Sequence, residues 1–279
     1  MALTINTNFM SLNAQRNLNG AQGQMGTALQ RLSSGLRINS AKDDAAGLYV
    51  AERMSSDIRG INQAVRNAGD GISLGQTAEG ALGQITNNLQ RIREIAVQSA
   101  NGTLSDDDRG GLQAEVDQLT QEISRIVDTT EFNGTALLNA TGSLTFQVGQ
   151  DGATNQTVSV STADLTSIDG YDADLANLKT VDVSTQGAAS AAIANMDTSV
   201  KTVSTTRATF GAVQNRFEAV ISNLQNYAEN LTAARGRIMD ADFAAETANL
   251  TRSQILQQAG VAMLAQANQV PQTALSLLR

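Results

Sequence analysis

Apolar side chains recur every seven residues over a long stretch in the C-terminal half of the chain. The positions that carry this repeat are Met196, Val203, Phe210, Phe217, Leu224, Leu231 and Ile238. A seven-residue apolar repeat places one stripe along a helix, and that stripe must be covered by another helix. The pattern predicts a helix over about 190–235, roughly 70 Å long, that packs in a coiled coil or bundle.

The N-terminal segment carries a similar apolar stripe. Its members are separated by steps of seven, four, three and four residues: Leu18, Met25, Leu29, Leu32 and Leu36. Residues 45–99 are also helical by composition and contain the glycines Gly69, Gly71 and Gly75. Because no strand precedes these glycines and their spacing differs from a dinucleotide-binding fingerprint, they favour flexibility or close helix packing over phosphate binding.

A helix start is marked at Ser105, which is followed by Asp106, Asp107 and Asp108. Serine caps a helix N-terminus, and acidic residues stabilise the first turn because they face the positive end of the helix dipole. A calcium loop would need spaced oxygen ligands, a glycine and a distal glutamate, so the aspartate run indicates capping. The helix that follows presents one apolar face, made by Leu112, Val116, Leu119, Ile123 and Ile126.

The apolar period changes to two in the middle of the chain, at Leu144, Phe146 and Val148 and again at Val158 and Val160. This alternation predicts a β-hairpin with a long loop. Residues 162–187 have no strong period, and we expect them to be irregular with a short helix near 173–178. A break over 236–242 is then followed by a last helix over 244–268.

Pro271 helps to end that last helix in this interpretation, because proline lacks the amide hydrogen that a helix interior requires. The predicted fold is therefore mainly α, with long antiparallel helices in a coiled-coil or bundle arrangement and a small β-hairpin region. Covering every apolar stripe requires the chain to fold back so that both termini pair. The expected parts are 1–43 with 237–279, 44–139 with 188–236, and the turn-around region 140–187.

The two chain ends also share an unusual charge pattern. All 27 acidic residues lie between Asp43 and Glu246, together with 13 of the 19 basic residues. The ends on either side therefore contain no acid, although the whole chain has a formal net charge of −8. We interpret the ends as helices that pack in an interior and carry an acidic body between them.

Composition narrows the possible chemistry. The chain has no His and no Cys, which removes the usual zinc, copper, haem and iron–sulfur ligand sets and the imidazole-based triads. We therefore expect no enzyme activity and no cofactor. The negative net charge and the presence of only three lysines argue against nucleic acid. No secretory signal or membrane-length apolar span is visible, so we expect a soluble protein that does not use the signal-peptide route.

Apolar residues crowd the C-terminal end of the chain beyond what one helix pair can cover. They are Leu264, Val270, Leu275, Leu277 and Leu278. Exposed apolar patches usually mark an interaction surface. The sequence therefore predicts that the chain ends bind other molecules.

Several segments resemble bacterial flagellins. At the N-terminus these are residues 2–8, ALTINTN, and residues 31–47, RLSSGLRINSAKDDAAG. At the C-terminus they are Arg237-Ile238 and residues 240–243, DADF, then residues 254–260, QILQQAG, residues 264–272, LAQANQVPQ, and residues 275–278, LSLL. The resemblance covers about 1–140 and 190–279. Residues 140–190 are too short for the large outer domains of many flagellins, which implies a near-minimal form.

The resemblance implies a structural subunit that self-assembles into the flagellar filament for motility and is exported to the outside of the cell by the flagellar type III route. In such a subunit, 1–43 and 237–279 form the inner core and the other helices form the outer core. Its partners would be copies of itself, an export chaperone, the filament cap and the hook–filament junction proteins. The residues expected to pack the filament core are Leu18, Met25, Leu29, Leu32, Leu36, Leu256, Met263, Leu264, Leu275, Leu277 and Leu278.

Residues 90–99 resemble the flagellin segment that a vertebrate Toll-like receptor recognises. Arg91, Ile95 and, on the next helix, Glu115 match the main contact positions of that segment, with Ile95 in place of a more usual leucine. The alternative role for these three residues is packing between neighbouring protofilaments, which we take as their primary one. The terminal leucines Leu275, Leu277 and Leu278 likewise resemble the part read by cytosolic innate sensors.

Three other functions remain open at this level. A hook–filament junction protein shares the terminal similarity. An enzymatic flagellin with a metalloprotease insert is disfavoured by the short middle region and the absence of His. A soluble adhesin or immune ligand would fail to extend a filament seed.

Overall fold

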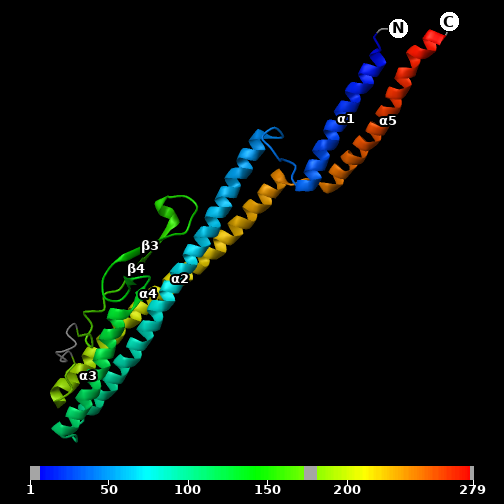
Figure 1. Cartoon of the computed structure of the whole chain (residues 1–279). Helices are drawn as coiled ribbons and strands as arrows, with labels where there is room; N and C mark the ends of the chain where they lie inside the picture. Colours follow the sequence, from blue (N-terminus) through cyan, green and yellow to red (C-terminus); the bar gives the residue numbers. More distant parts are fainter. Residues whose placement is uncertain (1–6, 173–180, 277–279) are drawn as a thin grey trace. The chain divides into compact units, whose positions relative to one another are not determined.

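The computed structural model describes residues 7–172 and 181–276, with side chains up to residue 269. It is mainly α with two small antiparallel sheets, as the sequence predicts (Figure 1). The long helices are α1 (Phe9–Ser34), α2 (Ala45–Ser99), α3 (Asp106–Thr129), α4 (Gln186–Met239) and α5 (Phe243–Ser276). Within the described residues, no helix is both long enough and apolar enough to cross a membrane.

The chain forms two compact units. The first contains Met1–Ile58 and Glu229–Arg279, and the second contains Arg59–Ala228. The first unit is thus built from both ends of the chain, and the prediction that the chain folds back to pair its termini is confirmed. The predicted boundaries at 43/44 and 236/237 concern layers of an assembled filament and stay a prediction.

The core of the second unit lies among α2, α3 and α4. Its fully buried side chains include Leu82, Ile85 and Leu89 of α2 and Val116 and Ile123 of α3. The apolar repeat of α4 supplies its other wall, since Met196, Val203, Phe210 and Phe217 are all buried. The last three members of the repeat, Leu224, Leu231 and Ile238, are only half-buried.

Two glycines let α2 and α4 approach closely. A β-carbon added at Gly71 would lie 2.5 Å from Cζ of Phe217, and one at Gly75 would lie 2.9 Å from Cγ of Gln214. At Gly69, by contrast, an added β-carbon would meet nothing within 4 Å. The close-packing interpretation of this glycine run therefore holds for Gly71 and Gly75.

The start of α3 is capped as predicted. The Ser105 hydroxyl accepts the Asp108 N–H at 3.2 Å, and the Asp108 carboxylate accepts the Ser105 N–H at 3.1 Å, which completes a capping box. One turn further on, the buried guanidinium of Arg109 donates to the carbonyls of Ser99, Asn101 and Leu104. A cation at the carbonyl end of α2 complements its dipole, so Arg109 fixes the α2–α3 turn.

The predicted hairpin consists of β3 (Ser143–Gln147) and β4 (Thr157–Ser161), joined by a loop that contains the short 3-10 helix η1 (Thr154–Gln156). The strands are antiparallel, with Leu144 opposite Val160 and Phe146 opposite Val158. Phe146 packs edge-on against Phe217 of α4, with ring centroids 5.5 Å apart. The apolar face of the hairpin thus joins the core of the second unit.

A smaller ribbon precedes the hairpin. Its strands β1 (Glu131–Phe132) and β2 (Thr135–Ala136) surround Asn133 and Gly134, which both have positive φ, 51° and 76°. These are the residue types that a tight two-residue hairpin turn selects. Asn133 and Gly134 thus form a tight turn between β1 and β2.

The chain returns to α4 along a segment that α3 and α2 hold in place. The Gln113 amide of α3 donates to the Val181 carbonyl at 2.9 Å and accepts the Val183 N–H at 2.6 Å. The Ser99 hydroxyl donates to the Val183 carbonyl at 2.6 Å. The short helix predicted near 173–178 lies outside the described residues.

The end of the chain departs from the prediction. The helix α5 continues past Pro271 to Ser276, so the expectation that Pro271 helps to end it is wrong. Proline cannot donate to the carbonyl four residues earlier, which here belongs to Ala267. That carbonyl instead accepts a hydrogen bond of 2.8 Å from the side-chain amide of Asn8. The break between the last two helices is also shorter than expected, because α4 extends to Met239.

Candidate interaction surfaces of the terminal helices

The first unit is tied together where α1 ends and α4 gives way to α5. Gly35 takes the left-handed conformation (φ 71°) and donates to the Arg31 carbonyl at 2.8 Å, which closes α1. The next residues form an antiparallel bridge between Leu36 and Asp240. Its hydrogen bonds run from the Arg37 N–H to the Met239 carbonyl (2.6 Å) and from the Ala241 N–H to the Gly35 carbonyl (2.9 Å).

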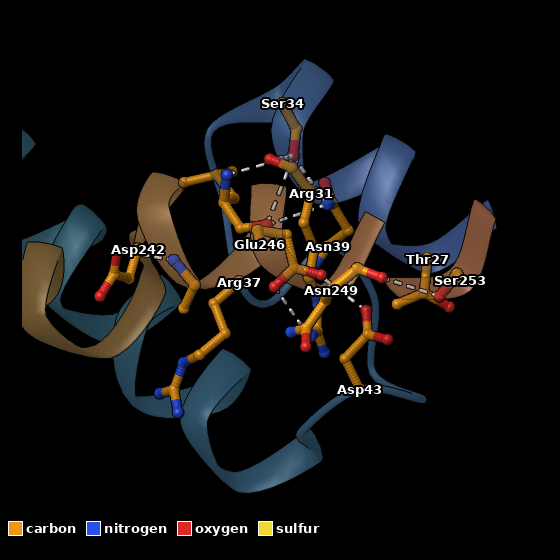
Figure 2. Close-up of polar contacts among 12 residues, drawn as sticks. Thr27, Arg31, Ser34, Arg37, Asn39, Asp43, Asp242, Glu246, Asn249 and Ser253 are labelled. Carbon is orange, nitrogen blue, oxygen red and sulfur yellow. Dashed lines mark hydrogen bonds and ion pairs between the residues drawn. The ribbon is translucent and has the colours of Figure 1, made fainter. Parts of the chain in front are cut away.

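Side chains reinforce this bridge (Figure 2). The Arg37 guanidinium donates to the Ile238 carbonyl at 2.6 Å, at the end of α4 where the helix dipole is negative. Asn39 donates from its side-chain amide to the Ser34 hydroxyl at 2.8 Å. The exits of α1 and α4 are thereby held side by side.

Asp43 organises the turn that leads into α2. Its carboxylate accepts hydrogen bonds from the Asn39 N–H, the Ser40 N–H and the Ser40 hydroxyl, at 2.9–3.1 Å. The backbone N–H of Asn39 and then the hydroxyl of Ser40 hold the pKa of Asp43 below its ordinary value. The neighbouring Asp44 accepts the Gly47 N–H at 2.8 Å and so caps the first turn of α2.

The helices α1 and α5 pair antiparallel through small side chains. Ala21 and Ala28 of α1 are buried, and a β-carbon added at Gly260 of α5 would lie 3.8 Å from Cβ of Leu18. Near the bridge end, Arg31 of α1 forms an ion pair of 3.8 Å with Glu246, which is 8% exposed (Figure 2). The seam is therefore narrow and leaves the larger side chains outside it.

Those larger side chains face outward. Phe9 is 68% exposed and Met263 is 61% exposed, and the other exposed large apolar residues of the two helices are Met10, Leu12, Leu29, Phe243, Ile255, Leu256 and Val261. Some of them line an apolar groove of ≈ 370 Å³ whose walls include Met10, Leu256, Gly260 and Met263. Apolar surface of this extent marks a site that another molecule covers.

The predicted packing residues occupy two environments in this unit. Leu18, Met25, Leu32, Leu36 and Leu264 are half-buried, whereas Leu29, Leu256 and Met263 are exposed. Leu275 lies in α5 beyond the last described side chain, and Leu277 and Leu278 lie outside the described residues. One helix pair thus covers only part of the stripe.

Sequence reasoning missed several residues of these surfaces. Phe9, Ile255 and Val261 do not follow the seven-residue spacing of the apolar stripe. The absence of acidic residues around them is the sequence feature that indicates burial against another molecule. Asn8, Arg31 and Glu246 contact their partners across more than 200 positions of sequence, so no local pattern could find them.

A second, charged surface lies on the second unit. Arg91 of α2 forms ion pairs with Glu115 of α3 (2.8 Å) and with Glu94 (3.1 Å), and hydrogen bonds to Glu115 and then Glu94 raise the pKa of Arg91. The predicted pair Arg91 and Glu115 is thus brought together at the surface. Ile95, predicted with them, is 1% exposed and belongs to the core, so its side chain does not reach this surface.

These surfaces offer packing and ion pairing. Within residues 7–172 and 181–276, no cluster of three or more acidic residues could hold a metal ion. The chain-wide absence of His and Cys leaves carboxylates, hydroxyls, side-chain amides, Lys and Arg as the polar groups of its side chains. What the first unit can do is bury apolar area against another copy or another protein.

Comparisons with known proteins agree with this geometry. Residues 5–143 match the family model described as the bacterial flagellin N-terminal helical region, and residues 193–278 match the bacterial flagellin C-terminal helical region. The unmatched stretch between them holds the hairpin and the segment that returns to α4.

Relatives match along the whole chain. A flagellin of Halalkalibacterium halodurans is 47% identical over 278 residues, which is 99% of this chain and 100% of that protein. Flagellin D of Vibrio anguillarum is 37% identical and covers all of both chains over 376 aligned positions. That alignment is longer than the 279 residues of this chain, so the Vibrio protein has segments that this short form lacks.

Solved structures give the same result. A Bacillus cereus flagellin structure is 32% identical with a TM-score of 0.50, over 61% of this chain and 94% of that one. A putative flagellar hook-associated protein from Vibrio parahaemolyticus has a TM-score of 0.58 over 71% of this chain and all of its own, but at 16% identity it shows the fold alone. With both terminal regions matched and a relative of nearly equal length at 47% identity, the chain belongs to the bacterial flagellin family.

Proposed function

We propose that this chain is the structural subunit of a bacterial flagellar filament, an extracellular polymer of its own copies that serves motility. The observation that carries the proposal is the uncovered apolar surface of α1 and α5, which includes Phe9, Met10, Ile255 and Met263. Monomeric soluble proteins rarely expose such a surface, whereas identical copies in a helical array can cover it. Family membership supplies the independent support.

The distribution of acidic residues also supports assembly through the terminal helices. The ends contain no acid between 1 and 42 or between 247 and 279, so copies can approach through these helices without repulsion between carboxylates. The acidic residues all lie between Asp43 and Glu246 and would keep the outside of a filament hydrated. In this proposal 1–43 and 237–279 form the inner core, 44–139 and 188–236 form the outer core, and 140–187 forms the turn-around region.

Further partners follow from the proposed role. A filament subunit that leaves the cell through the flagellar type III route needs an export chaperone, and its polymer needs a cap and hook–filament junction proteins. The Arg91–Glu115 pair is exposed and joined by an ion pair of 2.8 Å, which suits it to contact a neighbouring protofilament or a vertebrate Toll-like receptor. Because Ile95 is buried, such a contact would rest on the charged pair.

The alternative of a hook–filament junction protein has weaker support. Its structural likeness at 16% identity concerns the fold, whereas the relatives that match over the whole chain are flagellins. The filament subunit is therefore the preferred function.

Removal of one terminal helix tests the proposal. We expect a chain truncated after Glu246 to extend no filament seeds, because it lacks all but the first four residues of α5 and with them Ile255, Val261 and Met263 of the apolar surface. Residues 59–228 should keep their helices, since their core does not involve the deleted residues. Electron microscopy of seeded samples and far-ultraviolet circular dichroism measure the two expectations. Normal filaments from the truncated chain would refute the mechanism.

A paired substitution refines this test without shortening the chain. Ile255→Asp with Met263→Asp places two charges on exposed apolar positions of α5, and we expect it to stop elongation. Ile255→Leu with Met263→Leu keeps both positions apolar and should elongate as the wild type does. Equal elongation by the two pairs would show that this surface stays in contact with water.

A further inference from the structure

Pro271 creates a specific acceptor on α5. A proline within a helix cannot donate to the carbonyl four residues earlier, and that carbonyl belongs to Ala267. Ala267 is 8% exposed, so water cannot freely replace the missing donor. An interior position of α5 thus carries a carbonyl that needs a donor from another element.

Asn8 supplies that donor from the other end of the chain. Its Nδ2 donates to the Ala267 carbonyl at 2.8 Å, and its Oδ1 accepts the Ser11 N–H at 3.1 Å, which caps α1. The two bonds require one donor and one acceptor on the same short side chain. Asp at this position could cap α1 equally well, but its ionised carboxylate carries no donor. Ser carries a hydroxyl that can accept and donate, but this hydroxyl is one bond shorter than the amide, so an oxygen placed to accept the Ser11 N–H falls short of the Ala267 carbonyl that Nδ2 reaches.

The seam between α1 and α5 needs such a contact to define its register. Its buried side chains Ala21 and Ala28 are small, and Leu18 faces Gly260, so the seam has few large side chains that interlock. A helix pair of this kind distinguishes poorly between neighbouring registers, and a single polar contact commonly selects one. The Leu36–Asp240 bridge fixes the chains at the other end of the pair, so the end near Asn8 needs a contact of its own.

We propose that Asn8 is a positioning residue for assembly: by donating to the carbonyl that Pro271 leaves without a helical donor, it sets the register of α1 against α5. Ala267 lines the same apolar groove as Met10 and Met263. The register therefore decides whether the apolar residues of the two helices form one surface for the next copy. This inference rests on the proposed filament function.

A double-mutant cycle tests the coupling between Asn8 and Pro271 in the full chain. Asn8→Ser keeps the cap but shortens the side chain, so that the hydroxyl that accepts the Ser11 N–H no longer reaches the Ala267 carbonyl, while Pro271→Ala returns an amide hydrogen that can reach it. We expect Asn8→Ser to raise the critical concentration for elongation of wild-type seeds about tenfold when Pro271 is present. In the Pro271→Ala background we expect a rise of about twofold.

Sedimentation of seeded samples measures the critical concentration as the protein that remains in the supernatant. Asn13→Ser is the matched control, because it removes an exposed asparagine amide from the same helix and the same groove. Equal effects of Asn8→Ser in the two backgrounds, or an effect no larger than that of Asn13→Ser, would overturn the inference. If the wild-type chain itself fails to extend seeds, the filament function fails instead.

A cross-linking experiment reads the register directly, since the chain has no cysteine of its own. Leu18→Cys with Gly260→Cys would place the two β-carbons about 3.8 Å apart, which suits a disulfide. Leu18→Cys with Leu264→Cys samples a register one turn away. We expect a brief oxidation of filaments to link the first pair within each chain, and Asn8→Ser to shift linkage toward the second. An unchanged ratio would leave Asn8 only a capping role and overturn the inference.

Discussion

Gly71 shows how a single hydrogen in place of a side chain determines the distance between two helices. Its α-carbon faces the ring of Phe217, which is fully buried and packed edge-on against Phe146. The ring cannot move away without disturbing the hairpin. Alanine at this position would therefore have to push α2 and α4 apart or displace Phe217.

We expect Gly71→Ala to lower the free energy of unfolding by about 1–3 kcal/mol, because it overpacks this contact. Gly80→Ala is the matched control in the same helix, since an added β-carbon there meets nothing within 4 Å. That control should raise stability by about 0.5–1 kcal/mol through helix propensity. Urea unfolding followed by circular dichroism measures both. A neutral Gly71→Ala would mean that the contact is looser than the structure shows.

Single residues were predictable where their role was local. Ser105 and Asp108 form the predicted cap, because a capping box involves residues that lie within four consecutive positions of the sequence. Pro271 was misjudged because the carbonyl that it leaves without a helical donor is bonded to Asn8, which lies 263 positions away from Pro271 in the chain. Ile95 was assigned to a surface by resemblance, whereas the structure places it three residues after the buried Ile92, on the core face of α2.

The capping box at the start of α3 makes the stability of this helix depend on pH. The hydroxyl of Ser105 and then its N–H hold the pKa of Asp108 below its ordinary value of 3.8. A carboxyl whose pKa is lower in the folded state stabilises that state above its unfolded pKa. The contribution is lost as the pH falls through the folded pKa.

We therefore expect the melting temperature to fall when the pH is lowered from 7 to 3, and Asp108→Asn to make that fall smaller. Asp107→Asn is the matched control, because it removes a charge from the same helical turn and leaves the Ser105–Asp108 bonds in place. Melting curves recorded at several pH values provide the comparison. If the two variants respond to acid alike, the capping box is not the source of the effect.

Whole elements were predictable where the apolar period was long. The repeat from Met196 to Ile238 predicted α4, and the alternation at Leu144 and Phe146 predicted β3. The ends of helices were harder to predict from the sequence. For example, α4 extends to Met239, whose carbonyl accepts a hydrogen bond from Arg37 in the segment after α1. Such contacts join distant parts of the chain and leave no periodic trace.

At the scale of the whole molecule, stability is divided unevenly between the two units. The main apolar cluster, from Ala68 to Phe217, lies entirely within Arg59–Ala228. The first unit instead has a narrow seam and exposes many of its large apolar residues. The buried cluster of Arg59–Ala228 supports independent folding of that unit, whereas the exposed apolar surface of the first unit requires a partner.

We expect a fragment of residues 59–228 to unfold cooperatively, at a temperature within a few degrees of the main transition of the full-length monomer. The reason is that the fragment retains the whole cluster around Leu82, Ile123 and Phe210. Circular dichroism and calorimetry of both proteins make the comparison. A fragment without cooperative unfolding would place part of the folding energy in the terminal helices.

The folded-back path of the chain was predictable because each apolar stripe needed a cover and the two acid-free ends matched each other. The register between those ends was not, since small residues such as Ala21 and Ala28 permit several alignments. Contacts in the folded chain, such as those of Asn8, Arg31 and Arg37, specify one of them.

The bridge between Leu36 and Asp240 also has a mechanical consequence. The chain leaves α1 through residues 35–44 and enters α5 through residues 240–242, and two backbone hydrogen bonds and the Arg37 guanidinium hold these crossings together. A pulling force that slides residues 35–37 along residues 238–241 has to break these hydrogen bonds at the same time before either segment can extend. Under such a force the Leu36–Asp240 bridge would open first, and its hydrogen bonds can form again afterwards. The helices next to the bridge would keep their length when a rotating filament is twisted.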